Sequence, residues 1–135
     1  MSTVRQIVAD QIKADNPEFI VKGFPTTALD RIPAGKTSVQ VYRDRLEPAS
    51  NGTSLSHSLK IIVMVAKQGT EQAETDLEEA LDLVLLSLER SRTVIYSSVD
   101  RDVVDDMHLY VISAAASTTN HYKNLVREEQ KAVTP

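Results

Sequence analysis

The residues from Thr70 to Arg92 constrain the fold of this chain more than any other stretch, because they spell one long amphipathic helix. Aliphatic side chains recur there at three- and four-residue spacing, which places them on one helical face: Ala73, Leu77, Ala80, Leu81, Val84, Leu85 and Leu88. Thr70 can cap the first turn, and acidic residues crowd the positive end of the helix dipole. Leu83 and Leu86 widen the stripe towards its C-terminal half, which predicts contact with a second surface there.

A long β-hairpin is predicted before this helix. Residues 38–47 and 55–65 alternate apolar and polar side chains, and Asn51-Gly52 between them is a strong turn signal because both residues tolerate positive φ. One face of the first strand begins with valines and continues with Arg43 and Arg45. The charged end of the hairpin is therefore expected to project beyond the core, with a polar tip and a buried base.

Shorter elements are predicted on either side of these two. They are a helix over 3–15, a short strand over 19–21, an edge strand over 28–32 and, after the central helix, strands over 93–99 and 108–116 with a turn beginning at 100–102. The expected fold class is α+β: a mainly antiparallel four-stranded sheet with a long hairpin, packed by one long central helix and an N-terminal helix. Residues 1–117 would form this domain, and 118–135 a C-terminal arm or short helix.

Composition excludes several kinds of chemistry. The chain of 135 residues has globular proportions, with 41% hydrophobic and 25% charged residues. It has no cysteine, which removes disulfides and thiolate sites, and its net charge of -4 argues against non-specific nucleic-acid binding. No nucleophile elbow and no Gly-rich phosphate loop is present, and the three histidines lack metal-site spacing. The prediction is a protein with no enzymatic activity, no cofactor and no membrane segment.

A group of aspartates between residues 100 and 106 needs separate weighing, because hard cations take several oxygen ligands. Their spacing matches no EF-hand loop, and aspartate is common in turns. We therefore interpret them as a solvated turn and predict no metal site. Arg43 and Arg45, beside Asp44 and Glu47, have two interpretations: a solvated strand end, or a charged hairpin edge that meets another subunit through salt bridges and strand pairing.

Several stretches resemble the tail terminator proteins of long-tailed bacteriophages, the family of minor tail protein U. TSVQVYRDRLEP is similar to the family's first hairpin strand, which ends in a charged run and a proline. SHSLKIIVMVAKQGTEQAETDLEEALDLVLLSLE is similar to its second strand, Gly-containing turn and acidic-then-leucine helix. TVIYSSVDRD and MHLYVISAAAS resemble its closing strand pair, so the resemblance covers roughly residues 36–117. The segment that follows extends past the family's usual end.

The resemblance implies a structural role in the virion. Such proteins form a hexameric ring on the last ring of tail tube subunits, halt tube growth and present a surface to the head-completion or neck protein. DNA would pass through the lumen without specific binding. The implied location is the head-proximal end of the tail, after assembly in the host cytoplasm.

A ring subunit needs two different, complementary edges, because its contacts are heterologous and close by rotation. We hypothesise that Arg43 and Arg45 supply one edge and pair with acids of the next subunit: Glu78, Glu79 or Asp82. The hairpin tip is hypothesised to contact the tail tube protein through Ala49, Ser50, Asn51, Gly52 and Thr53.

Two alternatives to a terminator stay open. One is another head–tail connector or tail-completion protein. The other, from a different class, is a small non-enzymatic regulatory adaptor that binds one partner as a monomer or dimer. Ring stoichiometry separates the adaptor from the phage proteins, and the morphology of particles lacking the protein separates a terminator from a completion factor.

Overall fold

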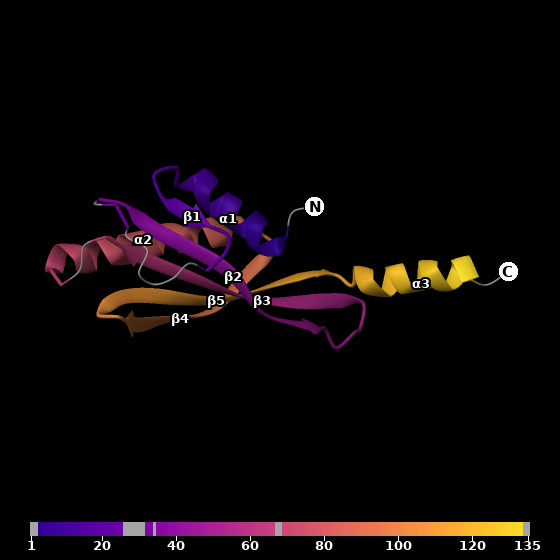
Figure 1. Ribbon diagram of the computed structural model, residues 1–135. Coiled ribbons are helices and arrows are strands. Elements are labelled where there is room, and N and C mark those ends of the chain that lie inside the picture. Colours follow the sequence, from indigo (N-terminus) through magenta and orange to yellow (C-terminus); the bar gives the residue numbers. More distant parts are fainter. Residues whose placement is uncertain (1–2, 26–31, 34, 67–68, 134–135) are drawn as a thin grey trace.

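The computed structural model describes residues 3–25, 32–33, 35–66 and 69–133 (Figure 1). Among these residues the chain forms an α+β fold with a five-stranded mixed sheet and three helices. In chain order the elements are α1 (Val4–Asp15), β1 (Ile20–Lys22), β2 (Thr37–Pro48), β3 (Ser54–Val65), α2 (Glu71–Arg90), β4 (Val94–Val104), β5 (Met107–Thr119) and α3 (His121–Val133).

The strand order is β1-β2-β3-β5-β4, and only the β1–β2 pair is parallel. The α+β class is as expected, but the sheet has five strands where the sequence predicted four. The additional strand is the short segment expected over 19–21, which pairs with the start of β2 from Ile20 to Lys22. It enters parallel because a long connection, and no tight turn, separates it from β2. The edge strand expected over 28–32 falls mainly on residues outside those that the structure describes.

The closing hairpin is longer than the sequence predicted. β4 was expected to end at residue 99 before a turn, yet it runs on to Val104 and pairs with β5 throughout that extension. The turn consists of Asp105 and Asp106, whose φ values of 50° and 64° are the positive values that a two-residue hairpin loop requires. Arg101 was placed in the turn by its aspartate neighbours. In the structure its guanidinium pairs with Glu74 of α2, which holds this part of β4 against the helix.

The core lies between one face of the sheet and the two helices α1 and α2, which cover the same face (Figure 1). Alternating residues of the sheet supply its floor: Val39, Val41, Leu59, Ile61, Val63, Val94, Ile112, Ala114 and Ala116. α2 contributes the predicted stripe, of which Leu81 and Leu85 are only partly buried. Thr70 caps the helix as expected, with its Oγ1 3.0 Å from the Ala73 N–H. The stripe therefore docks the helix on the sheet.

A polar contact that the stripe did not reveal joins α1 to α2. Ser87 is fully buried among the apolar residues of α2, and its hydroxyl donates to the Asp15 carboxylate at the end of α1. Arg90 Nη1 lies 3.4 Å from the same carboxylate, and Gln11 donates to it at 3.0 Å. These donors hold the pKa of Asp15 below its ordinary value, with the Ser87 hydrogen bond as the largest cause. The ionised carboxylate thus stabilises the helix pair.

The C-terminal region leaves this packed body. β5 continues to Thr119, and after Asn120 the chain forms α3, which projects away from the sheet and the other helices (Figure 1). α3 has only sparse contact with the other described elements. The division into a domain over 1–117 and a separate segment over 118–135 stays a prediction. Within the described part of the chain, no helix is long and apolar enough to cross a membrane.

Candidate subunit interface

The arginine half of β2 contains a β-bulge that changes where its side chains point. Arg43 pairs with Leu59 and Arg45 with Ser58, so Asp44 is an extra residue on the β2 side. An inserted residue moves everything after it to the opposite face of the strand. The prediction that Arg43 and Arg45 share one face is therefore wrong: Arg43 lies on the helix side of the sheet and Arg45 on the opposite side.

The bulge also brings apolar residues back to the helix side near the hairpin end. Leu46 pairs with His57, and Pro48 pairs with Leu55. Arg45 and Glu47 remain on the opposite side, with Arg45 Nη2 3.2 Å from Glu47 Oε2. Both side chains of this ion pair are largely exposed, so it contributes little to stability. It leaves the arginine available for another partner.

His57 is the buried polar residue of this half of the hairpin. Its Nε2 lies 2.8 Å from the Thr118 hydroxyl, while its Nδ1 has no hydrogen-bond partner among the described residues. Burial lowers the pKa of His57, and the nearby charges of Arg43 and His121 lower it further. The imidazole is therefore held neutral. Its surroundings show that Arg43 and the start of α3 belong to the same end of the molecule.

The acids hypothesised to meet these arginines lie elsewhere. Glu78, Glu79 and Asp82 are exposed on α2, and none of them forms an ion pair with another described residue of the chain. α2 lies over the start of β2 and the end of β3, whereas the arginines occupy the other half of the hairpin (Figure 1). Within one copy, the structure therefore does not bring the two predicted groups together.

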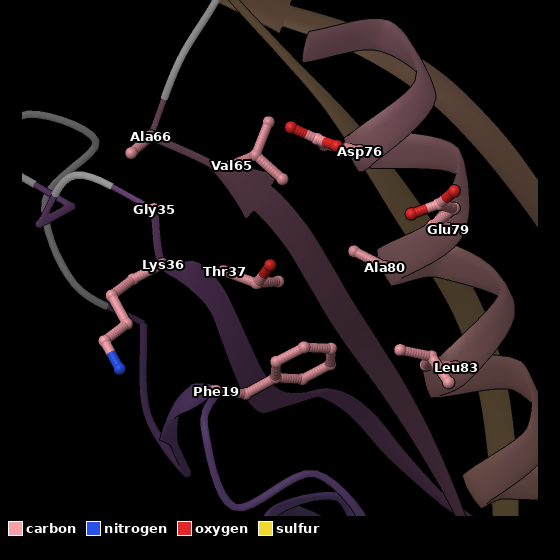
Figure 2. A pocket seen from close by; sticks show the side chains of 10 residues that line it. All are labelled: Phe19, Gly35, Lys36, Thr37, Val65, Ala66, Asp76, Glu79, Ala80 and Leu83. Carbon is pink, nitrogen blue, oxygen red and sulfur yellow. The ribbon is translucent and has the colours of Figure 1, made fainter. Parts of the chain in front are cut away.

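One of the acids borders a hollow beside α2. Figure 2 shows Glu79 and Asp76 on the helix, above Ala80 and Leu83, facing a wall that includes Phe19 and other residues near the sheet end. The hollow measures about 340 Å³, and apolar atoms form much of its lining. Asp76 was not among the predicted interface residues. The wide stripe around Leu83 was the signal for a second surface, and Leu83 is 41% exposed at the edge of this hollow.

The hairpin tip hypothesised to contact the tail tube protein is a polar, hydrogen-bonded loop. Asn51 Oδ1 accepts from the N–H groups of Thr53 and Ser54, at 3.0 and 3.3 Å. The Gly52 N–H donates to Ala49 at 2.9 Å, and Gly52 has a φ of 70°, which favours glycine. The predicted Asn-Gly turn signal thus marks the actual turn.

Asn120 joins the tip to the C-terminal helix. Its N–H donates to the Thr53 carbonyl at 2.9 Å, and its Oδ1 accepts from the Lys123 N–H at 3.4 Å, as an N-cap of α3 does. Its Nδ2 also lies 3.5 Å from the Gly52 carbonyl. The tip and the start of α3 therefore form one unit. The sequence offered one signal for this, an asparagine immediately before a helix-length amphipathic segment, which our sequence interpretation did not use.

Comparison with known proteins gives no relative from which a function could be transferred, so a functional proposal depends on the geometry described above. No family model matches the sequence, and no curated protein matches it. In the described part of the chain, no group of three or more acidic or histidine side chains is placed to hold a metal ion. The likeness to tail terminators rests on the stretches quoted above and stays a prediction.

Proposed function

We propose that this protein is a structural subunit of a phage tail that assembles into a ring, caps the tail tube and stops its growth. One observation carries the proposal: the arginine half of β2 and the acidic face of α2 lie in different parts of one copy, and no ion pair among the described residues joins them there. Charge pairing between two copies would satisfy both surfaces. The proposal also draws on the resemblance of residues 36–117 to the tail terminator family.

The separation of the two surfaces favours a ring over a symmetric dimer. A two-fold interface requires the same patch to face itself, whereas different patches on one subunit give head-to-tail contacts that close by rotation. Like charges would oppose a two-fold contact through the acidic face of α2, and opposite charges favour a contact between that face and the arginines of β2. In this arrangement Arg43 and Arg45 reach acids on α2 of the next subunit from the two sides of β2, and the hexameric number comes from the resemblance.

The same proposal assigns a partner to the hairpin tip, to another face of the ring and to its lumen. The tip from Ala49 to Thr53 contacts the tail tube protein, and another face of the ring contacts the head-completion or neck protein. DNA passes through the lumen without specific binding, as suits a net charge of -4. The ring has no catalytic role and needs no cofactor.

Tail length in particles assembled without this protein tests the proposal directly. Overlong, unattached tubes seen by electron microscopy are the expected result, because growth would have lost its stop. Tails of normal length that fail to join heads would instead indicate a head–tail connector or completion protein. Normal whole particles would contradict both and leave the regulatory adaptor.

Ring formation can be tested separately with charge variants. Arg43→Glu together with Arg45→Glu is expected to abolish the ring, measured by mass photometry or by light scattering after gel filtration. Arg92→Glu is a control at an exposed arginine that follows α2. Intact rings in the double variant would refute the pairing of these two arginines, without bearing on the tail-length result.

A further inference from the structure

α3 has an apolar row that its own copy does not cover. Tyr122, Leu125 and Val126 follow one another at helical spacing and are each 50–52% exposed. The helix projects from the body, so its own α2 lies out of its reach (Figure 1). An amphipathic helix of 13 residues is only marginally stable without a surface to pack on. The row therefore needs a partner outside the chain.

Two basic side chains lie on one side of this row. Tyr122 and Val126 border a hollow beside the hairpin tip, floored by Pro48 and Leu55, whose charged lining residues are Lys123 and Arg127. These two are one helical turn apart and lie on the same side of α3. Glu129, three residues after Val126, continues the row, and Glu128 lies on its other side; neither lines this hollow. The surface next to the tip is therefore apolar with a positive edge.

α2 carries a surface of complementary character. Glu79, Asp82, Leu83 and Leu86 recur at three- and four-residue spacing and form one ridge, with Leu83 41% and Leu86 50% exposed. The two leucines are apolar groups of the kind that would cover the row on α3. The two carboxylates are the partners that Lys123 and Arg127 would take.

We propose that α3 of one copy packs along this α2 ridge of a second copy, with its apolar row on Leu83 and Leu86 and its basic pair opposite Glu79 and Asp82. α2 and the projecting α3 occupy different parts of the molecule, and the two surfaces differ, so the contact is head-to-tail (Figure 1). This inference rests on the self-association in the proposed function, and it leaves Glu78 of α2 as the acid that faces the arginines of β2. The contact is intrinsic to the chain and forms in the purified protein.

Charge-swap complementation tests this pairing. One variant carries Lys123→Glu and Arg127→Glu, and the other carries Glu79→Lys and Asp82→Lys. Each alone has like charges at the contact and is expected to self-associate at least about tenfold more weakly than the wild type. An equal mixture is expected to associate again, because each variant then meets an opposite charge on its neighbour. Arg92→Glu serves as the control outside both surfaces.

The outcomes separate the inference from the proposed function. Wild-type association by either single-surface variant, failure of the mixture to associate, or a monomeric wild type would overturn the α3–α2 contact. None of these results changes the tail-length experiment, which can succeed while this contact fails. Association of the mixture alone would establish the contact even if particles without the protein had normal tails.

Thiol crosslinking gives an independent readout, because the chain has no cysteine of its own. Leu83→Cys and Leu125→Cys, made in separate chains and mixed, are expected to give a crosslinked dimer with a short bifunctional maleimide. Ala115→Cys replaces Leu83→Cys in the control, since Ala115 is exposed on the sheet face opposite the helices. Equal crosslinking in the control, or none in the test pair, would contradict the proposed contact.

Discussion

The two ends of the hairpin formed by β2 and β3 differ in what surrounds them. At one end Val39, Ile61 and Val63 are fully buried under α1 and α2. At the other end the strands extend past the helices, carry a bulge and a polar tip, and meet the end of β5 and the start of α3. The first arrangement supplies stability. The second keeps charged and apolar groups exposed, which is expected of a surface that binds a partner.

The largest loss of stability is expected from a substitution in the packed end. Leu77 is 1% exposed, so Leu77→Ala should lower the free energy of unfolding by about 2–5 kcal/mol through lost burial and a cavity. Leu86 lies on the same helix but is 50% exposed, and Leu86→Ala should change it by less than about 0.5 kcal/mol. Urea unfolding of both variants, at a protein concentration where the chain is monomeric, measures the difference. Equal losses would mean that Leu86 is covered within one copy.

The next effect concerns the hydrogen bond between Ser87 of α2 and Asp15 at the end of α1. Asp15→Ala should cost about 1–3 kcal/mol at neutral pH, because Ser87 loses its acceptor and Arg90 its ion pair. The pKa of Asp15 is lowered in the folded state, so its contribution is present above the ordinary aspartate pKa and is lost as pH falls through the folded value. Urea unfolding across that acidic range should show a weaker pH dependence in Asp15→Asn. An unchanged dependence would contradict this role.

The packed end was largely predictable from the sequence, because periodicity reports burial. The stripe of α2, its cap at Thr70 and the alternation of β3 each follow from local spacing. Ser87 was missed since a hydroxyl interrupts the apolar pattern, and its acceptor lies 72 residues away. Such a contact depends on how two helices meet, which no local pattern encodes.

The hairpin end was predicted less well, and the reasons are local and physical. The bulge at Asp44 reversed the face of every following residue, and strict alternation cannot show an inserted residue. The turn was placed at Asp100 because aspartates are common in turns, whereas the positive φ values occur at Asp105 and Asp106. The link between Asn120 and the tip joins segments that are distant in sequence. The pairing of Arg43 and Arg45 with the α2 acids remains untested.

A smaller effect concerns local stability, which should depend on pH at the hairpin end more than at the packed end. The pKa of buried His57 is lowered by burial, Arg43 and His121, so the folded state binds a proton there less readily than the unfolded chain does. Stability from the neutral imidazole is therefore present above the ordinary histidine pKa and is lost as pH falls below it. Between about pH 7 and 5, the protection of amides from hydrogen exchange, corrected for the intrinsic rate, should fall more at the hairpin end than in α2.

His57→Leu is the matched variant for this prediction, because leucine fills the buried position with an apolar side chain that cannot titrate. Its hairpin amides should not show the extra loss of protection at low pH after correction for intrinsic exchange. His108→Leu is the control at an exposed histidine. The same loss of protection in His57→Leu would assign the pH dependence to another group.

The smallest effect on overall stability should come from the junction of the tip and α3. Asn120→Ala removes the side-chain cap of α3 and the amide contact to Gly52, while its backbone bond to Thr53 remains. Loss of an N-cap costs about 1 kcal/mol, but here the cost falls on a helix with sparse contact to the body. We therefore expect faster exchange throughout α3 and little change in the thermal midpoint. A midpoint that falls as far as in Leu77→Ala would show that α3 unfolds together with the core, and the contrast between the two ends would then be wrong.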